Sequence, residues 1–427
     1  MDVCIVGAGF TGLWTSWFLK TQDPSIRVAV IEQRQVGFGA SGRNGGWVQT
    51  ALPSSIAEIA SSHSVSAARA VHNAMVESVA AIGSFAGEHA PGSHFTQAGQ
   101  LHVATNSAQL ARLNRWVTDH HRFGMSETDY RGLSIAEIAG KIRVAGVVGG
   151  YFTPHCAVVN PRPLIDALAA LCESLGVHIF ENTRAEEITP GRVRTRQGDV
   201  KCTVVVRATE GYTANFRRDH RELMPIFSLM IATEPLAQDV WDEIGWAERF
   251  AFSDGRNLII YAQRTADDRI AFGGRGAPYR FGSNTHDRFA DNIGAHMILR
   301  KELVRLFPVL ADTAITHRWG GILGVSRDWN ASVGFDRRSG FAWAGGYVGD
   351  GLTATHLAGQ TVADLIFRHD TERTTLPWVG HRSRKWEVEP FRTLGVRAIS
   401  ALAASIDEAE SRGRHARIRS KVFDLML

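Results

Sequence analysis

The first 32 residues limit the possible folds of this chain more than any other segment. The glycine pattern Gly7-Ala8-Gly9-Phe10-Thr11-Gly12 follows the apolar run Val3-Cys4-Ile5-Val6, and Glu32 closes a second apolar run, Val28-Ala29-Val30-Ile31. In such a pattern the first glycine permits a tight turn, the second lets the backbone approach a pyrophosphate, and the third lets helix and strand pack closely. The order of strand, turn, helix, strand and acid predicts a dinucleotide site at a helix N-terminus, with Glu32 on a ribose.

Composition is that of an ordinary globular protein. The chain has 427 residues, of which 44% are hydrophobic and 21% charged, which is enough for a large core in two domains. A net charge of +4 from scattered basic residues favours anionic ligands slightly and does not indicate a nucleic-acid partner. The sequence does not indicate an oligomeric state.

Four cysteines, widely spaced and without a C-x-x-C motif, predict buried thiols and neither disulfides nor a metal site. No apolar run approaches the roughly 20 residues that span a membrane. The N-terminus enters a strand without a preceding basic stretch, so no signal peptide is expected and a cytoplasmic location is the default expectation.

Periodicity predicts that the nucleotide-binding fold is interrupted and resumed. Helices are expected over 66–88, 107–121, 160–175, 287–307 and 352–367, and strands over 101–104, 177–180, 203–208 and 341–344. Between these lie strands that look antiparallel, at 228–233, 258–263 and 269–273. The pattern indicates two interleaved domains, and an amphipathic tail from Pro390 is expected to pack on the body as a helix.

Two further glycine loops predict close approach of the backbone to a ligand. Residues 37–47 read GFGASGRNGGW, in which Ser41, Arg43 and Asn44 offer donors where the far half of a dinucleotide must lie. Residues 345–353 read GGYVGDGLT, again between a strand and a helix whose N-terminus can stabilise negative charge on a reduced cofactor ring. Asp350 is expected to cap that helix.

At these loops, and in IATEPL at 231–236 and RIAFGGR at 269–275, the chain resembles FAD-dependent oxidoreductases of the D-amino-acid oxidase family, most of all their gamma-glutamylputrescine oxidase-like branch. The resemblance covers nearly the whole chain. It implies an α/β (α+β overall) flavoprotein of the glutathione-reductase type, with a Rossmann-like FAD-binding domain interleaved with a mixed or antiparallel substrate domain. The implied segments are 1–90, 150–215 and 316–370 for FAD, 91–149 and 216–315 for substrate, and 371–427 for a C-terminal helical extension.

The resemblance also implies site residues. Ala185 would contact the adenine end, and Ala208 and Gly211 would lie along the pyrophosphate. With the glycine loops, the residues expected to bind FAD are Gly7, Gly9, Phe10, Thr11, Gly12, Glu32, Gln33, Arg34, Gly39, Ala40, Ser41, Arg43, Asn44, Gly45, Gly46, Ala185, Ala208, Gly211, Gly346, Tyr347, Gly349, Asp350, Gly351, Leu352 and Thr353.

Two departures from the related sarcosine-oxidase branch affect the expected chemistry. That branch has a substrate-binding lysine where this chain has Thr353, so a simple alpha-amino acid is less favoured than an amine with a more distant acidic group. That branch also attaches its flavin through a cysteine near 319–325, a stretch that reads WGGILGV here, so a non-covalent FAD is expected.

The function implied is oxidation of the C–N bond of a primary or secondary amine by hydride transfer to flavin N5, followed by imine hydrolysis and flavin reoxidation by oxygen or another acceptor. Arg269 or Arg275 would assist the oxygen reaction, Arg264 would pair with an acidic substrate group, and Tyr261 and Trp47 would line the site.

Two alternatives remain open. One is a flavin hydroxylase or reductase fed by NAD(P)H, which the absence of a second strand–GxGxxG–helix unit disfavours. The other is a flavin-binding protein without turnover.

Overall fold

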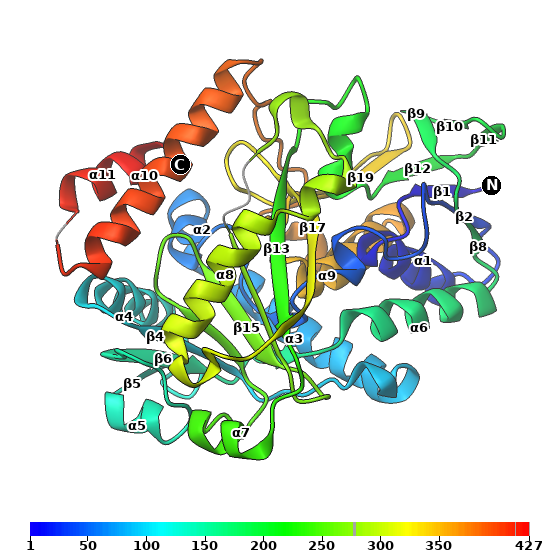
Figure 1. Cartoon of the computed structure of the whole chain (residues 1–427). Helices are drawn as coiled ribbons and strands as arrows, with labels where there is room; N and C mark the ends of the chain where they lie inside the picture. The colour runs from blue at the N-terminus through cyan, green and yellow to red at the C-terminus, as the bar shows by residue number, and fades with distance from the viewer. Residues whose placement is uncertain (276–278, 415, 427) are drawn as a thin grey trace.

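The computed structural model describes residues 1–275, 279–414 and 416–426. Two large sheets form separate halves of the molecule, with the six-stranded sheet beside the N-terminus and the eight-stranded sheet around β13 and β15 (Figure 1). None of the described helices is long and apolar enough to cross a membrane.

The six-stranded sheet confirms the nucleotide-binding pattern. All its pairings are parallel except that of β18 with β19, and β1 lies inside the sheet between β12 and β2. Because β1 and β12 pair from Val3↔Val204 to Val6↔Arg207, the loops after both strands meet at one edge. The strands run in the order β18 (Ser332–Asp336), β19 (Phe341–Gly345), β12 (Val204–Arg207), β1 (Val3–Val6), β2 (Val28–Ile31) and β8 (His178–Phe180).

Helices cover this sheet and continue toward the other half. Helix α1 contacts both α6 and α9, and α3 contacts α9 and the strand β3. These helices are α1 (Phe10–Gln22), α2 (Ile56–Ser62), α3 (Val65–His89), α6 (Pro161–Ser174) and α9 (Gly351–Phe367). Short strands complete this half as a pair, β3 (Trp47–Gln49) with β7 (Cys156–Val158), and a three-stranded sheet of β9 (Ala185–Thr189), β10 (Arg192–Thr195) and β11 (Asp199–Lys201).

The eight-stranded sheet is antiparallel except where β14 pairs with β4, which confirms the expectation for the middle strands. Successive side chains along each strand point to opposite faces of this sheet. Leu101, Phe252 and Phe272 enter an apolar core. The strands run in the order β17 (Ile315–Val325), β13 (Met224–Thr233), β16 (Ile270–Arg275), β15 (Ile260–Arg264), β14 (Ala251–Asp254), β4 (Gln100–Ala104), β6 (Gly149–Thr153) and β5 (Arg131–Leu133).

Two of the segments expected in the FAD-binding domain contribute a strand to the eight-stranded sheet. The segments 150–215 and 316–370 were expected in the FAD-binding domain, yet β6 pairs with β4 and β5, and β17 pairs with β13 along nearly its whole length. Both strands therefore belong to the eight-stranded sheet. Sequence motifs mark the nucleotide site itself, whereas pairing between distant strands leaves no local signal.

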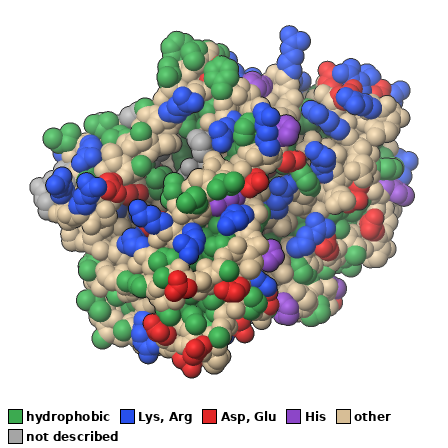
Figure 2. Space-filling model, viewed as in Figure 1, with side chains coloured by type: hydrophobic (Ala, Val, Ile, Leu, Met, Phe, Trp, Pro, Cys, Tyr) green, Lys and Arg blue, Asp and Glu red, His purple; other side chains and the backbone are tan. Residues whose placement is uncertain are grey.

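The remaining helices cover the eight-stranded half and its edge. They are α4 (Ser107–Arg122), α5 (Ile135–Ala139), α7 (Gln238–Ile244) and α8 (Ile293–Leu306), followed by α10 (Phe391–Ser411) and α11 (Arg417–Met426). As expected for the tail, α10 and α11 are helices on the outside of the body (Figure 1). Figure 2 shows basic side chains gathered over this end of the molecule, where Arg412, Arg414, Arg419 and Lys421 are exposed.

Candidate active site

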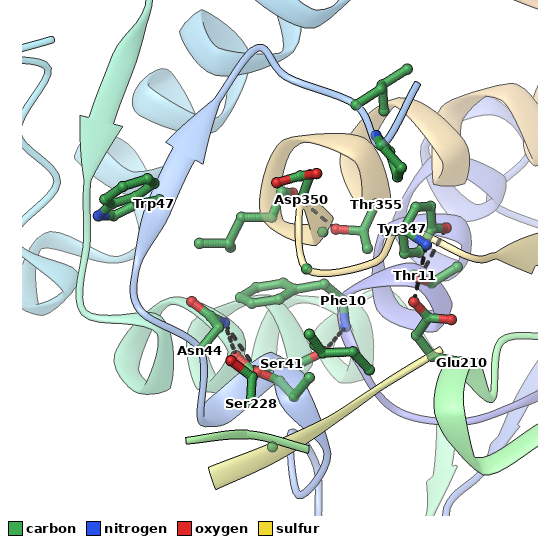
Figure 3. A pocket seen from close by; sticks show the side chains of 18 of the residues that line it. Phe10, Thr11, Ser41, Asn44, Trp47, Glu210, Ser228, Tyr347, Asp350 and Thr355 are labelled. Carbon is green, nitrogen blue, oxygen red and sulfur yellow. Dashed lines mark hydrogen bonds between the residues drawn. The ribbon is translucent and has the colours of Figure 1, made fainter. Parts of the chain in front are cut away.

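One cavity of about 830 Å³ runs from the carboxyl edge of the six-stranded sheet to the polar face of the eight-stranded sheet. All three glycine loops contribute to its wall. Figure 3 shows side chains from these loops, including Phe10, Asn44 and Asp350, around one hollow. Loops distant in sequence therefore form a single site, at the edge where open α/β sheets bind ligands.

The first glycine turn is packed so tightly that side chains are excluded. Gly7 has φ +110°, and a Cβ there would lie 2.4 Å from the carbonyl oxygen of Ala208. A Cβ on Gly9 would lie 2.8 Å from Ser41 Oγ, which accepts a hydrogen bond from the Phe10 N–H at 2.9 Å. The backbone at Gly9 is thus left bare on the cavity wall.

Glu32 lies at one end of the cavity with Gln33 and Ala185. Its two carboxylate oxygens accept hydrogen bonds from the backbone N–H groups of Ala8 and Arg34, each at 2.9 Å. Burial raises the pKa of this carboxyl group. The Arg34 side chain turns away from the wall and pairs with Asp287 at 3.5 Å.

The second glycine loop carries a buried donor. Arg43 donates from Nε to the Phe38 carbonyl at 2.6 Å and from Nη1 to the Gly320 carbonyl at 3.2 Å. Its Nη2 is buried with no hydrogen-bond partner among the described residues. Nη2 lies 4.0 Å from a carboxylate oxygen of Asp287, too far for a hydrogen bond, so it can still donate to an anionic or polar ligand in the cavity that Arg43 lines.

Glu210 fixes the third glycine loop, and the sequence analysis missed it. Its carboxylate accepts hydrogen bonds from the N–H groups of Gly346 at 3.0 Å and Tyr347 at 3.1 Å (Figure 3). Burial raises the pKa of Glu210 to about 7. The motif ATEGY contains this residue, but nothing in the motif shows that its side chain reaches a loop more than a hundred residues away.

Asp350 occupies the N-cap position of α9, as expected, but its side chain makes no capping hydrogen bond to that helix. It accepts a hydrogen bond from Gln49 Nε2 at 2.7 Å instead, and Gln49 Oε1 accepts one from Gln100 Nε2 at 3.2 Å. These contacts connect the third glycine loop through β3 to the eight-stranded sheet.

A comparison with models of protein families identifies the family of this chain. The family model of the FAD-dependent oxidoreductases, DAO, matches residues 2–365. The chain belongs to this family. The resemblance drawn from the glycine loops is confirmed, and FAD is the cofactor of the enzyme.

Individual relatives agree with this assignment. Gamma-glutamylputrescine oxidoreductase of Escherichia coli (strain K12) is 29% identical over 380 residues, which cover 87% of this chain and 84% of the relative. A probable oxidoreductase of Haemophilus influenzae is 28% identical over 383 residues, covering 86% of this chain and 83% of its own. Among solved structures, glycine oxidase from Geobacillus kaustophilus matches with a TM-score of 0.76 at 21% identity, covering 90% of this chain and 99% of that one. That likeness confirms the expected fold.

The cavity of this FAD-dependent oxidoreductase offers hydrogen-bond donors and stretches of backbone without side chains, both of which suit a dinucleotide. Most of the residues expected to bind FAD lie on its wall: Gly7, Gly9, Phe10, Thr11, Glu32, Gln33, Gly39, Ala40, Ser41, Arg43, Asn44, Gly45, Ala185, Ala208, Tyr347, Gly349, Asp350, Gly351 and Leu352. The other six do not line the cavity: Gly12, Arg34, Gly46, Gly211, Gly346 and Thr353. Gly211, for example, packs so closely under β17 that a Cβ would lie 2.5 Å from Ile322.

The catalytic candidates separate into two groups. Trp47 and Tyr261 line the cavity with ring centroids 5.7 Å apart, and the Tyr261 hydroxyl and Ser228 Oγ lie 2.7 Å apart. Arg264 lies elsewhere, pairing with Asp268 at 2.6 Å and stacking on Trp241 at 4.1 Å. The Arg275 side chain lies outside the described residues.

Arg269 faces a separate shallow hollow with Trp319 and pairs with Asp267 at 2.7 Å. We therefore expect Arg269→Gln to change the rate of flavin reoxidation by less than about twofold, because Arg269 does not line the FAD cavity and its charge is already paired with Asp267. Stopped-flow mixing of the reduced enzyme with oxygen checks this. A tenfold slower reoxidation would restore Arg269 as the cation that assists oxygen.

Sequence reasoning also missed the far end of the cavity, which we call the distal chamber. The polar face of the eight-stranded sheet forms its floor and α2, α3 and α4 contribute its other walls. Its lining includes His72, Gln100, His102, Arg112, Trp116, His120, Tyr130, Tyr151, Thr153, Ser253, Asp254 and Arg256. The alternation of Gln100 and His102 with buried Leu101 and Val103 was the available signal.

Two threonines expected near the cofactor have different surroundings. Thr11 lines the cavity, and its hydroxyl lies 3.3 Å from that of Tyr347. Thr353 is buried behind the wall, and its Oγ1 has no hydrogen-bond partner in the described part of the chain.

We expect Thr353→Val to keep FAD affinity and raise the unfolding free energy by about 1 kcal/mol, because an unsatisfied hydroxyl is removed.

Thr11→Val serves as the comparison and is expected to weaken FAD binding by about tenfold, since a cavity-wall hydroxyl is lost. Titration of both apoenzymes with FAD and chemical denaturation provide the measurements. Loss of FAD affinity in Thr353→Val would show that the cofactor reaches this residue.

Proposed function

We propose that this enzyme oxidises the C–N bond of a primary or secondary amine to an imine, which water hydrolyses to a carbonyl compound. The observation that carries the proposal is the continuity of the cavity, which leads from the FAD-binding loops past Trp47 and Tyr261 into the distal chamber. The relatives whose names specify amines or amino acids support it.

Bound FAD would accept the hydride equivalent from the carbon that carries the nitrogen. The protein's part is positioning. Gln263 Nε2 donates to the carbonyl of Gly45 at 2.7 Å and so holds the second glycine loop against β15. Ser228 fixes the Tyr261 ring, whose edge would meet a Cβ on Gly45 or Gly273. Rigid walls of this kind hold the reacting carbon in place, which contributes to rate without a dedicated acid–base pair.

The neutral surroundings suit an amine, which must be uncharged when it reacts. Burial lowers the pKa of His102 to about 3, so its imidazole is neutral at physiological pH. Its ring stacks on Tyr151 with centroids 4.6 Å apart. Such groups donate and accept hydrogen bonds without imposing a charge.

The test is product formation. Incubation of the FAD-loaded enzyme with a panel of polyamines, gamma-glutamylated amines, N-methyl amino acids and aminophosphonates is expected to yield a trapped carbonyl product from at least one of them. Consumption of NADPH with hydroxylation of a substrate would replace the proposal by the hydroxylase alternative. Absence of any product, with flavin bound, would favour a binding protein without turnover.

We also propose that the flavin is held without a covalent bond. None of the four cysteines, all of which the structure describes, lies on the cavity wall. Denaturation followed by ultrafiltration is expected to release all the FAD into the filtrate. Flavin that stays with the precipitated chain would show an attachment through another residue.

A further inference from the structure

The C-terminal helix α10 lies beyond the segment that the family model matches, yet two of its carboxylates bind residues on or next to the wall of the distal chamber. Glu410 binds Arg112 through both carboxylate oxygens, at 2.9 and 2.7 Å. Asp407 accepts hydrogen bonds from the backbone N–H groups of Asn257 and Leu258, both at 2.9 Å. The helix therefore holds the β14–β15 loop and one arginine of the chamber in place.

The Arg112–Glu410 pair is largely withdrawn from solvent. The Glu410 side chain is 4% exposed and that of Arg112 is 29% exposed. Arg112 also donates from Nε to the carbonyl of Gly255 at 2.9 Å, and both Arg112 and Gly255 line the cavity. These contacts occupy three of the five N–H donors of the guanidinium, and the bidentate carboxylate offsets its charge within the chamber.

The second arginine of the chamber is neutralised as well. Arg256 pairs with Asp254 at 2.6 Å, whose side chain is fully buried, and with Glu302 at 2.8 Å. Burial lowers the pKa of His72 to about 4 and that of His102 to about 3, so these two imidazoles are neutral at physiological pH, and burial also lowers the pKa of His120. The polar groups that remain for a ligand are imidazole, phenol, amide, hydroxyl and indole groups.

We propose that α10 completes the substrate site, and that Glu410 acts as a positioning residue that neutralises Arg112, so that the chamber selects amines whose distal part is uncharged and forms hydrogen bonds. This rests on the proposed amine oxidation. The sequence favoured a substrate with a distal acidic group, and we propose a distal uncharged group instead. Both arginines of the chamber are already paired with buried or half-buried carboxylates, so neither is free to bind a substrate carboxylate.

The experiment compares two ligands of equal shape, 4-aminobutanoate and 4-aminobutanamide, and their five- and six-carbon homologues. Binding to the FAD-loaded enzyme is measured by ligand-induced shifts in thermal stability, and by half-saturation of flavin reduction where reduction occurs. In the wild type the amide is expected to bind at least about tenfold more tightly than the carboxylate. In Glu410→Gln, which frees the charge of Arg112, this preference is expected to fall below about twofold through a gain in carboxylate affinity.

Two variants separate charge from structure. Glu408→Gln changes an exposed carboxylate of the same helix that pairs with Arg412, away from Arg112, and is expected to keep the preference for the amide. The double variant Arg112→Gln/Glu410→Gln removes both charges of the pair and is expected to restore the preference for the amide. This variant tests the proposal even where Glu410→Gln alone folds poorly. Equal or reversed affinities in the wild type, no binding of either ligand, or the same preference in Glu410→Gln would overturn the proposal. Because the thermal shift reports binding without turnover, it distinguishes this failure from failure of the proposed oxidation.

Discussion

Gly9→Val is expected to purify without flavin, with FAD affinity reduced by at least about a hundredfold, or roughly 3 kcal/mol. The new Cβ would lie 2.8 Å from Ser41 Oγ and displace the acceptor of the Phe10 N–H. The two methyl groups would also occupy the bare wall where the backbone is expected to approach the pyrophosphate. Reconstitution of the apoenzyme with FAD, followed by absorbance at the flavin band, measures the loss.

The matched control is Gly87→Ala, in the helix α3. A Cβ at Gly87 meets no atom within 4 Å, so this variant is expected to bind FAD as the wild type does and to gain about 0.5–1 kcal/mol of stability from its better helix propensity. Full flavin content in Gly9→Val would show that the first glycine turn does not hold the cofactor.

The free energy of unfolding is expected to fall as the pH rises from 4.5 to 7, because of Glu210. Its pKa rises from 4.5 to about 7 on folding, mainly because the side chain is buried. The folded state therefore binds the proton more tightly than the unfolded state, so this contribution is complete below pH 4.5 and lost as the pH rises through 7. Glu210→Gln does not titrate. Relative to it, the wild type is expected to lose up to about 3 kcal/mol of unfolding free energy across this interval.

Urea denaturation at pH 5 and pH 8 measures the difference, with Glu248→Gln as the control. The Glu248 side chain is 62% exposed, so that variant is expected to follow the pH dependence of the wild type. A wild-type profile parallel to that of Glu210→Gln would show that Glu210 is ionised throughout, held by the N–H groups of Gly346 and Tyr347.

The glycine-loop end of the cavity could be located from the sequence and the distal chamber could not, for a physical reason. Gly7, Gly9 and Ser41 act through local backbone geometry, which a short motif encodes. Glu210 and Arg112 act through partners at Gly346 and Glu410, which only the folded chain brings near.

The arginines near the middle strands show the same limit. Arg264 was expected to pair with an acidic substrate group and Arg269 to assist the oxygen reaction, but each side chain pairs with a nearby aspartate at the end of its hairpin. Alternation places a side chain on one face of a sheet and does not determine where a long side chain ends. For the same reason the pairing of β6 and β17 with the eight-stranded sheet was not predicted.

Anaerobic mixing of the FAD-loaded enzyme with a single amine is the most direct test of the account. We predict that an amine from the panel, with no nicotinamide present, bleaches the flavin band completely and leaves one equivalent of carbonyl product per flavin. Rapid bleaching by NADPH alone, with every amine leaving the flavin oxidised, would contradict it.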